Sequence, residues 1–186
     1  LLHERDRHYF YTDAILRYWV AYVQHGIEAP EFPGERDLMA VMNELDRKYQ
    51  QAATELGRSR EEQVRSLMRQ FTGQLVDGTI FGCAGEVVLP CFNEVKTYAR
   101  PDGRIEIDAI GEGKIPWAVE VKWKGKAIGR KELEAFMCKT KDMSVIKLWY
   151  VAKAGFTAEA KTYAGANGIM LSGEDELQRL TCELAG

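Results

Sequence analysis

The chain has 186 residues, of which 46% are hydrophobic and 28% are charged, and its formal net charge is −3. A chain of this length can bury a real core, so we expect one main domain with an appendage. The negative balance excludes a generally basic coat for nucleic acid, although local basic patches remain compatible with it. The sequence has no apolar run near the roughly 20 residues that cross a bilayer and no signal-peptide pattern.

The four cysteines are widely spaced and form no C-x-x-C pair: Cys83, Cys91, Cys138 and Cys182. This spacing indicates neither a zinc ribbon nor a disulfide framework, and it favours a reducing, cytoplasmic setting. The sequence begins at Leu1 rather than at Met, and we expect a fragment of a longer protein, or a processed or engineered chain.

An N-terminal helical segment is predicted over residues 1–34. From Tyr9 to Val23 the apolar residues recur at helical spacing, which is typical of a packing helix. The stretch from Gly26 to Gly34 contains two prolines and two glycines, which mark a linker. We therefore predict a boundary after residue 34, with the main domain over residues 35–186.

Two helices are predicted at the start of the main domain. The first covers Glu35 to Leu56 and ends at Gly57. Ser59 and Glu62 have the spacing of a capping box, which opens a second helix that continues to Leu75. The charged residues of both helices are typical of solvated faces.

The pattern becomes strand-like after residue 78. A strand is predicted over Val87–Tyr98 with an interruption at Pro90, and Arg100–Gly103 is predicted to be a turn. Further elements follow in alternation: a helix over Gly129–Lys141, a strand over Val145–Val151, a helix over Thr157–Ala166 capped by Thr157, a strand over Ile169–Leu171 and a helix over Glu174–Leu184. This order predicts a mixed α/β sheet.

The stretch from Arg104 to Lys122 is predicted to form two strands joined by a short connection. Ile107 and Ala109 are expected on one face of the first strand, and Asp108 on the other. In an antiparallel hairpin centred near Lys114, Asp108 lies opposite Glu120, with the two Cβ atoms about 5 Å apart. Glu120 and Lys122 share a strand face, so two carboxylates and an amine are expected to converge.

This convergence suits metal-dependent hydrolysis of a phosphodiester. A divalent cation relieves the repulsion between two carboxylates, and Asp108, Glu120, a backbone carbonyl such as that of Val121, and water form a reasonable Mg²⁺ shell. Lys122 would then face the water and the phosphate. The alternative is an exposed cross-strand ion-pair cluster. Apolar neighbours favour the first interpretation, because a charge in a central strand costs free energy.

Asp108, followed after eleven residues by Glu120-x-Lys122, resembles the metal-binding core of the PD-(D/E)xK nuclease superfamily. Gly155–Ala160 and Gly168–Leu171 are similar to the end of Mrr-type restriction endonuclease domains, and the resemblance spans roughly residues 57–180. It implies an α/β fold of the restriction-endonuclease-like type, a mixed β-sheet core flanked by helices. The proline that usually precedes the family's aspartate is absent, and Ile107 stands there instead.

The resemblance implies a nuclease that cleaves DNA with Mg²⁺ or Mn²⁺, with RNA left open as a substrate. Asp108 and Glu120 would bind the metal, and Lys122 would act on the water and the scissile phosphate. The family also places a glutamate on the helix before the first core strand. Glu61 fits this place best, and Glu62 and Glu86 remain open.

A basic stretch follows the carboxylates. Between residues 114 and 141 there are eight basic residues and three acidic ones, a local balance of +5. Four of the basic side chains are candidates for gripping DNA phosphates: Lys124, Lys126, Arg130 and Lys131. The alternative is a solubilising basic face. The resemblance also allows a homodimer, and nothing in the sequence identifies a dimer face.

A second function remains open. The segment Tyr9–Trp19 resembles the end of the winged-helix region in prokaryotic AAA-type ATPases that carry C-terminal nuclease-like domains. The domain could therefore serve as a nucleic-acid-binding or oligomerisation module, with weak or absent cleavage, of a larger ATPase whose ATPase region lies outside this chain. The complete Asp108, Glu120 and Lys122 set favours the nuclease.

Overall fold

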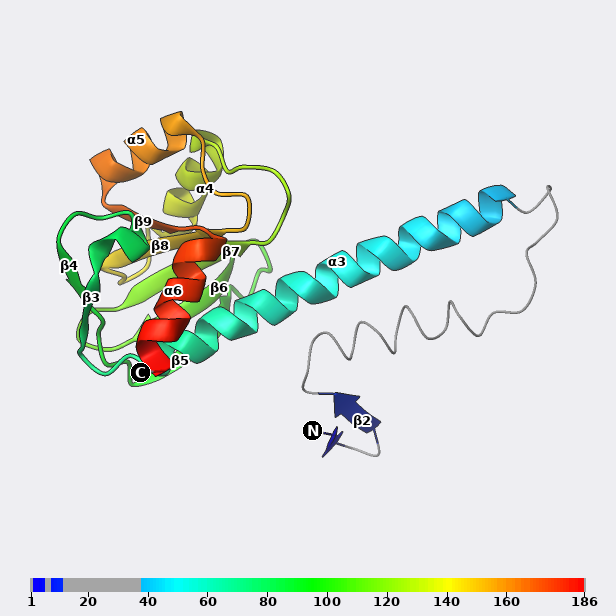
Figure 1. Ribbon diagram of the computed structural model, residues 1–186, viewed down its shortest axis with the longest axis horizontal. Coiled ribbons are helices and arrows are strands. Elements are labelled where there is room, and N and C mark those ends of the chain that lie inside the picture. The colour runs from blue at the N-terminus through cyan, green and yellow to red at the C-terminus, as the bar shows by residue number, and fades with distance from the viewer. Residues whose placement is uncertain (1, 6–7, 12–37, 186) are drawn as a thin grey trace. The chain divides into compact units, whose positions relative to one another are not determined.

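The computed structural model describes residues 2–5, 8–11 and 38–185 (Figure 1). Its contacts divide the chain into two compact units, Leu1–Ser59 and Arg60–Gly186, and each is described by itself. Within the described ranges, none of the helices combines the length and the apolar character needed to cross a membrane.

The first unit begins with a hairpin in which β1 (Leu2–Arg5) pairs antiparallel with β2 (His8–Tyr11). The helix predicted from Tyr9 is therefore wrong at its start. Aromatic residues favour extended strands, and three of the four residues of β2 are Tyr or Phe. The rest of that predicted helix, most of the ATPase-like segment and the boundary at residue 34 lie outside the described residues.

The helix α3 runs without a break from Leu38 to Met68. The predicted stop at Gly57 is wrong, because one glycine costs only about 1 kcal/mol relative to alanine in a helix interior. Ser59 does not cap a new helix, since the backbone on both sides is already helical. The carboxylate of Glu62 instead pairs with Arg65 at 3.0 Å and with Arg69 at 2.8 Å.

The second unit is built on a five-stranded sheet in the order β5-β6-β7-β8-β9. The pairs β5–β6 and β6–β7 are antiparallel, whereas β7–β8 and β8–β9 are parallel, so the predicted mixed sheet is confirmed. The strands are β5 (Glu94–Ala99), β6 (Glu106–Glu112), β7 (Trp117–Lys122), β8 (Lys147–Ala152) and β9 (Ile169–Ser172).

Three helices complete this unit close to their predicted places: α4 (Arg130–Thr140), α5 (Ala158–Asn167) and α6 (Glu174–Ala185). Thr157 caps α5 as predicted, because its hydroxyl accepts the N–H of Ala160 at 3.2 Å. The predicted turn is also present, with the N–H of Gly103 donating to the carbonyl of Arg100 at 2.8 Å.

The strand predicted over Val87–Tyr98 is in fact two strands. The short β4 (Glu86–Val88) pairs with β3 (Leu75–Asp77) in a separate two-stranded sheet, next to the 3-10 helix η3 (Gly78–Phe81). The chain leaves β4 just before Pro90, which has no N–H for a ladder, and re-enters a strand at β5. The interruption was predicted at the correct residue, whereas Leu75 was wrongly assigned to a helix.

Helices cover both faces of the five-stranded sheet (Figure 1), and each face carries a cluster of buried side chains. Trp117, Val119 and Val121 of β7 pack with the last turns of α3 and with α6. Ala118, between them, packs on the other face with α4 and α5. Because side chains alternate along a strand, Glu120 points to the face that α4 covers.

A β-bulge interrupts the pairing of β5 and β6. Lys96 pairs with Ile110 and Tyr98 pairs with Ile107, so Asp108 and its neighbour together oppose a single residue of β5. Ile107 and Ile110 consequently pack in the same core cluster, and Ala109 packs in the other. The prediction that Ile107 and Ala109 share a face is therefore wrong, because a bulge adds one residue and re-aims the side chain beside it.

Candidate active site

The hairpin of β6 and β7 has the predicted register. Ala109 pairs with Val119 and Ile110 pairs with Ala118, which centres the hairpin on Lys114. At the next position the ladder is replaced by a side-chain contact, in which Oδ2 of Asp108 accepts the backbone N–H of Val121 at 2.7 Å. The carboxylate of Asp108 is thereby fixed against β7.

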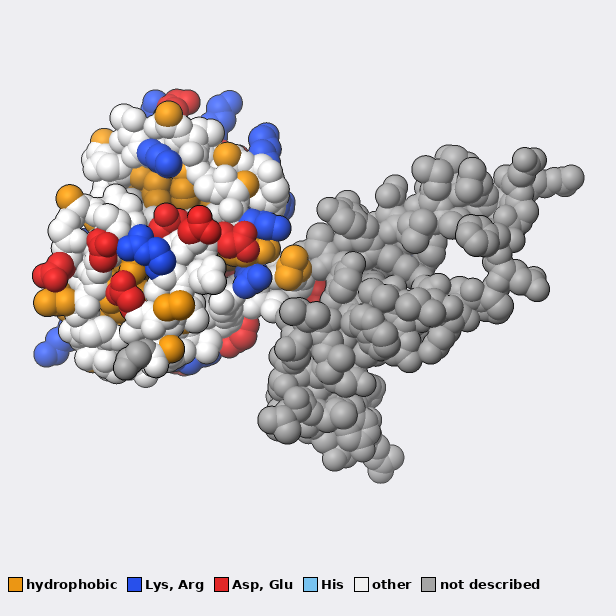
Figure 2. Space-filling view, viewed as in Figure 1, with side chains coloured by type: hydrophobic (Ala, Val, Ile, Leu, Met, Phe, Trp, Pro, Cys, Tyr) orange, Lys and Arg blue, Asp and Glu red, His pale blue; other side chains and the backbone are white. Residues whose placement is uncertain are grey.

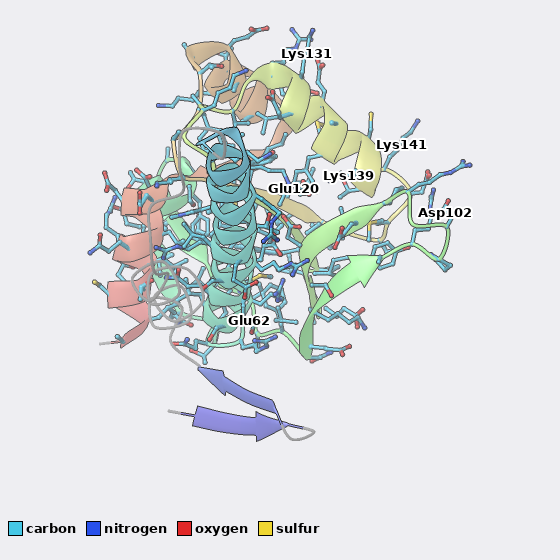
Figure 3. The ribbon with its side chains drawn as sticks, turned by 90° about the vertical axis from the view of Figure 1, so that its right-hand side faces the viewer. Glu62, Asp102, Glu120, Lys131, Lys139 and Lys141 are labelled. Atoms are coloured by element: carbon cyan, nitrogen blue, oxygen red, sulfur yellow. The ribbon has the colours of Figure 1, made fainter. Side chains whose placement is uncertain are left out.

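Glu120 is a buried carboxylate held by two ammonium groups. The residue is 3% exposed, and its Oε1 lies 2.7 Å from Nζ of Lys122. Nζ of Lys139, on α4, donates to Oε1 at 2.8 Å and to Oε2 at 3.0 Å (Figure 3). A buried charge is costly unless it is paired, which explains the two lysines. The burial of Glu120 argues against the alternative of an exposed ion-pair cluster.

The charges of the site act strongly on one another. Burial and then the negative charge of Glu120 raise the pKa of Asp108 above its ordinary value. Burial lowers the pKa of Lys122, but the hydrogen bond and charge of Glu120, with the charges of Asp108 and Glu61, outweigh burial and raise this pKa. Without a metal, Lys122 is therefore an ammonium rather than a base.

The structure places the three candidate glutamates differently. Burial and the charge of Asp108 raise the pKa of Glu61, while Lys122 opposes this rise, so Glu61 interacts with the site. Glu62 is paired with Arg65 of the same helix and with Arg69, just beyond the end of that helix. Glu86 lies on β4, outside the five-stranded sheet.

The donors around Asp108 and Glu120 fit a hard divalent cation. Mg²⁺ is usually bound through one or two carboxylates and keeps several waters. Burial and then the charge of Glu120 raise the pKa of Asp108, and a bound cation would instead favour its charged form. In the described part of the chain, no group of three or more His, Cys, Asp or Glu side chains is arranged to hold a metal.

Two contacts of the site were not predicted from the sequence. Lys139 was noted only as one member of the basic stretch, although it follows the buried Phe136 by three residues and therefore lies on the inward side of α4. The guanidinium of Arg65 donates to the backbone carbonyl of Asp108 at 2.6 Å. No local sequence signal identifies this second contact, which joins residues 43 positions apart.

The four residues proposed to grip DNA are exposed, and three of them make no ion pair with another described residue: Lys124, Lys126 and Lys131. Arg130 pairs with Glu134 at 2.7 Å, and its guanidinium lies 5.1 Å from the centre of the Tyr163 ring. An exposed pair of this kind contributes at most about 1 kcal/mol, so Arg130 can exchange its partner for a phosphate. Trp123 packs against the core, with the guanidinium of Arg60 over its ring, 4.6 Å from the centre.

The helix α6, on the opposite side of the sheet, begins with negatively charged side chains. Its first turn contains Glu174, Asp175 and Glu176. Figure 2 shows acidic side chains gathered over this end of α6. Negative side chains suit the positive end of a helix dipole, which explains their position. An anionic polymer is therefore expected to avoid this side and to favour the side of α4.

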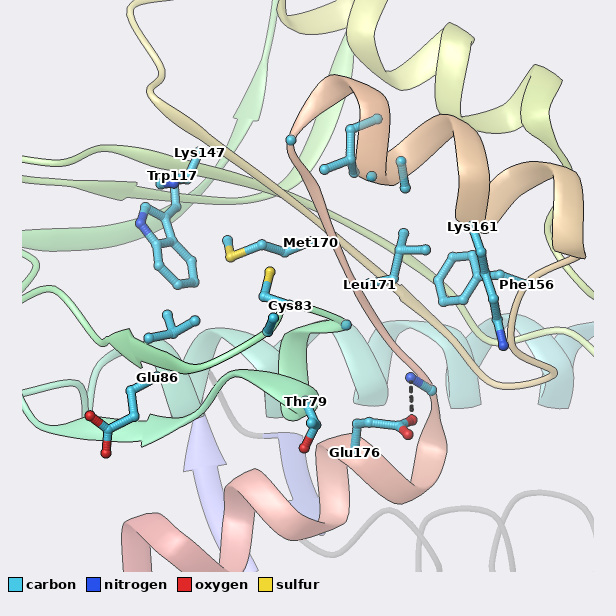
Figure 4. A pocket seen from close by; sticks show the side chains of 18 of the residues that line it. Thr79, Cys83, Glu86, Trp117, Lys147, Phe156, Lys161, Met170, Leu171 and Glu176 are labelled. Atoms are coloured by element: carbon cyan, nitrogen blue, oxygen red, sulfur yellow. Dashed lines mark hydrogen bonds between the residues drawn. The ribbon is translucent and has the colours of Figure 1, made fainter.

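A cavity of about 790 Å³ lies away from these carboxylates (Figure 4). Its lining includes Cys83, Trp117 and Met170, but none of Asp108, Glu120 and Lys122. The N–H of Gly173, another lining residue, donates to Glu176 at 2.9 Å, so the carboxylate of Glu176, labelled in Figure 4, already has a hydrogen-bond partner. The chemistry of the site therefore does not belong to this cavity.

Comparison with known proteins gives one family and two solved structures. Residues 92–181 match the Mrr_cat family, described as restriction endonuclease. A crystal structure of a protein of unknown function, AF1548, is 22% identical, with a TM-score of 0.40, over 61% of this chain and 56% of that chain. The DNA modification-dependent restriction endonuclease AspBHI is 14% identical, with a TM-score of 0.36, over 91% of this chain and 48% of that chain.

The chain thus spans about half the length of each of these two proteins. No curated protein matches it. None of the matches supports the predicted link to an ATPase.

Proposed function

Because residues 92–181 match the Mrr_cat restriction endonuclease family, we propose that this chain hydrolyses DNA phosphodiester bonds with Mg²⁺ or Mn²⁺. One observation carries the proposal. A β-bulge and the end of a strand bring Asp108 beside the buried Glu120, and Glu120 is in contact with Lys122. Two carboxylates and an ammonium at one strand end suit the neutralisation and hydrolysis of a phosphodiester.

The metal would be held by Asp108 and Glu120, with Glu61 from α3 as a further carboxylate. A divalent cation at this place supplies positive charge that activates water and neutralises the phosphate. Glu61 would act through its negative charge, which already interacts with Asp108 and Lys122.

The protein's own groups hold the geometry of this site. The backbone N–H of Val121 fixes one oxygen of Asp108, and Arg65 fixes the carbonyl of the same residue. Lys122 is about one third exposed at its side chain, so its ammonium can meet a phosphate that arrives from solvent. As an ammonium it would stabilise negative charge on the phosphate and orient the attacking water, rather than remove a proton.

DNA would approach from the side of α4. Lys124, Lys126, Arg130 and Lys131 would contact backbone phosphates there, which gives affinity without sequence preference. Each phosphate contact that is removed should reduce the slope of log K against log salt by about 0.9. The acidic first turn of α6 would discourage binding on the other side of the sheet.

A cleavage assay on the purified chain tests the proposal. Plasmid and linear duplex DNA, and RNA as a second substrate, are incubated with Mg²⁺ or Mn²⁺ and with EDTA. We expect divalent-dependent cleavage that is lost in Asp108→Asn, Glu120→Gln and Lys122→Ala. Cleavage should be retained in Lys141→Met, a control at an exposed residue that caps the C-terminal end of α4. Absence of cleavage in the parent chain with every substrate and metal would reject the nuclease.

A second candidate function is a DNA-binding module with little or no cleavage. It is favoured by the two ammonium groups that already neutralise Glu120. Under this alternative the parent chain binds duplex DNA with a salt-dependent affinity, but Lys122→Ala changes no cleavage because there is none to change. Loss of cleavage in Lys122→Ala with DNA binding preserved would reject the module.

A further inference from the structure

Lys139 bridges the two carboxylate oxygens of Glu120. Its ammonium donates to Oε1 at 2.8 Å and to Oε2 at 3.0 Å, and the ammonium of Lys122 lies 2.7 Å from Oε1. The neighbours of Lys139 on α4 fix its direction, because Phe136 and Thr140 are buried at 1% and 4% exposure. Lys139 therefore reaches the carboxylate from the covered side of the sheet.

The two partners of this contact differ in their access to solvent. The side chain of Glu120 is 4% exposed, and that of Lys139 is 33% exposed. A lysine side chain has four rotatable bonds and a strongly hydrated head, so it can turn outward into water. Glu120 has no such freedom, since it belongs to the central strand β7 and is enclosed by the sheet and α4. Of these two partners, Lys139 is therefore the one that can move.

A metal at Glu120 would compete with Lys139 for the same oxygens. A cation that takes up these oxygens meets an ammonium already placed on both of them, and like charges at this separation repel strongly in a partly buried site. Lys139 donates to both oxygens, so a cation that takes up either of them displaces at least one of its hydrogen bonds. Lys139 is therefore a group that has to move.

We propose that Lys139 is an exchangeable counter-ion of Glu120: it neutralises both oxygens in the metal-free protein and turns outward when a divalent cation binds there. This inference rests on the proposed metal site at Asp108 and Glu120. It makes Lys139 a positioning residue, which keeps the buried carboxylate in place before the metal arrives. Once released, its ammonium would lie on the side of α4 from which DNA would approach, where it can donate a hydrogen bond to a phosphate oxygen.

Titration of the metal-free chain with Mn²⁺ by calorimetry tests the exchange. The variants are Lys139→Met, which removes the charge and keeps the length, and Lys141→Met, which removes one exposed charge two residues away. We expect Lys139→Met to bind Mn²⁺ roughly tenfold or more tightly than the parent chain, because a competing charge is gone. Lys141→Met should bind as the parent does.

Two results overturn the inference and are distinguishable from each other. If the parent chain binds Mn²⁺ and Lys139→Met binds it equally or more weakly, Lys139 is no competitor, and the proposed function is untouched. If neither the parent nor Lys139→Met binds Mn²⁺, the metal site itself is wrong, and the proposed nuclease activity falls with the inference.

A second measurement follows the parent chain itself and uses a variant only to identify a resonance. The Nζ resonance of Lys139 in a chain with ¹⁵N-labelled lysine, identified by its absence in Lys139→Arg, is followed during a titration with Mg²⁺. We expect this resonance to shift and its protons to exchange faster with water, while that of Lys141 stays unchanged. A Lys139 resonance that stays in place at saturating Mg²⁺ would overturn the exchange.

Discussion

Replacing Asp108 by Asn should stabilise the metal-free protein while it destroys the proposed metal site. Burial and the nearby charge of Glu120 raise the pKa of Asp108, so the folded protein favours the neutral form of this side chain. Asparagine is a neutral side chain of the same shape, and its amide oxygen can still accept the N–H of Val121. The substitution therefore removes a repulsion without leaving the N–H of Val121 unpaired.

The size of the effect follows from linkage. Each unit of pKa difference between the folded and unfolded states corresponds to about 1.4 kcal/mol, so a raised pKa lowers the stability of the ionised form in proportion, and we expect Asp108→Asn to be more stable than the parent chain at about pH 7.5. Because the folded protein binds more protons at Asp108 than the unfolded chain does, its stability falls as pH rises through the raised pKa. The advantage of Asn should consequently shrink as pH is lowered toward the ordinary value of 3.8.

Urea denaturation in EDTA, at several pH values from about 4 to about 8, measures this difference. Asp142→Asn is the matched control, because Asp142 is an exposed aspartate just beyond α4 and its substitution should have little effect on stability. The reasoning would be refuted if Asp108→Asn lowered stability at about pH 7.5, or if its effect were the same at every pH.

Three further substitutions test the packing of the fold. Ser172→Ala should cost about 2 kcal/mol, since the buried hydroxyl accepts from Trp149 at 2.8 Å and donates to Ile80 at 2.6 Å; thermal denaturation measures the loss, with the exposed Ser144→Ala as control. Gly111→Ala should cost about 1–3 kcal/mol because a Cβ there would lie 2.6 Å from the Phe92 ring, and a neutral effect in the same assay would show that this ring moves freely. Gly57→Ala should increase helix content and stability by up to about 1 kcal/mol if α3 is continuous, whereas a decrease measured by circular dichroism would restore the predicted helix stop.

Much of the second unit could be predicted from the sequence, because its elements are regular. Alternation marks β7, and helical periodicity with a threonine cap marks α5, so the order of strands and helices followed from local patterns. The hairpin register could be predicted as well, since the short connection centred on Lys114 leaves one pairing that aligns the apolar faces of β6 and β7.

The remaining features depend on contacts between distant residues. The bulge at Asp108 arises from the pairing of β6 with β5, and a strict alternation of side chains conceals it. Lys139 reaches Glu120 only because α4 packs across β7, 19 residues away in sequence. The continuity of α3 through Gly57 shows the opposite limit, in which a local signal is too weak to end a long helix.

The most direct test of the metal site is anomalous diffraction from crystals of the chain soaked in Mn²⁺. We expect one strong peak with oxygens of both Asp108 and Glu120 at about 2.0–2.6 Å, and with Nζ of Lys139 withdrawn from Glu120. A fully soaked crystal in which manganese binds elsewhere or not at all, and in which Lys139 still contacts both oxygens of Glu120, would contradict the account.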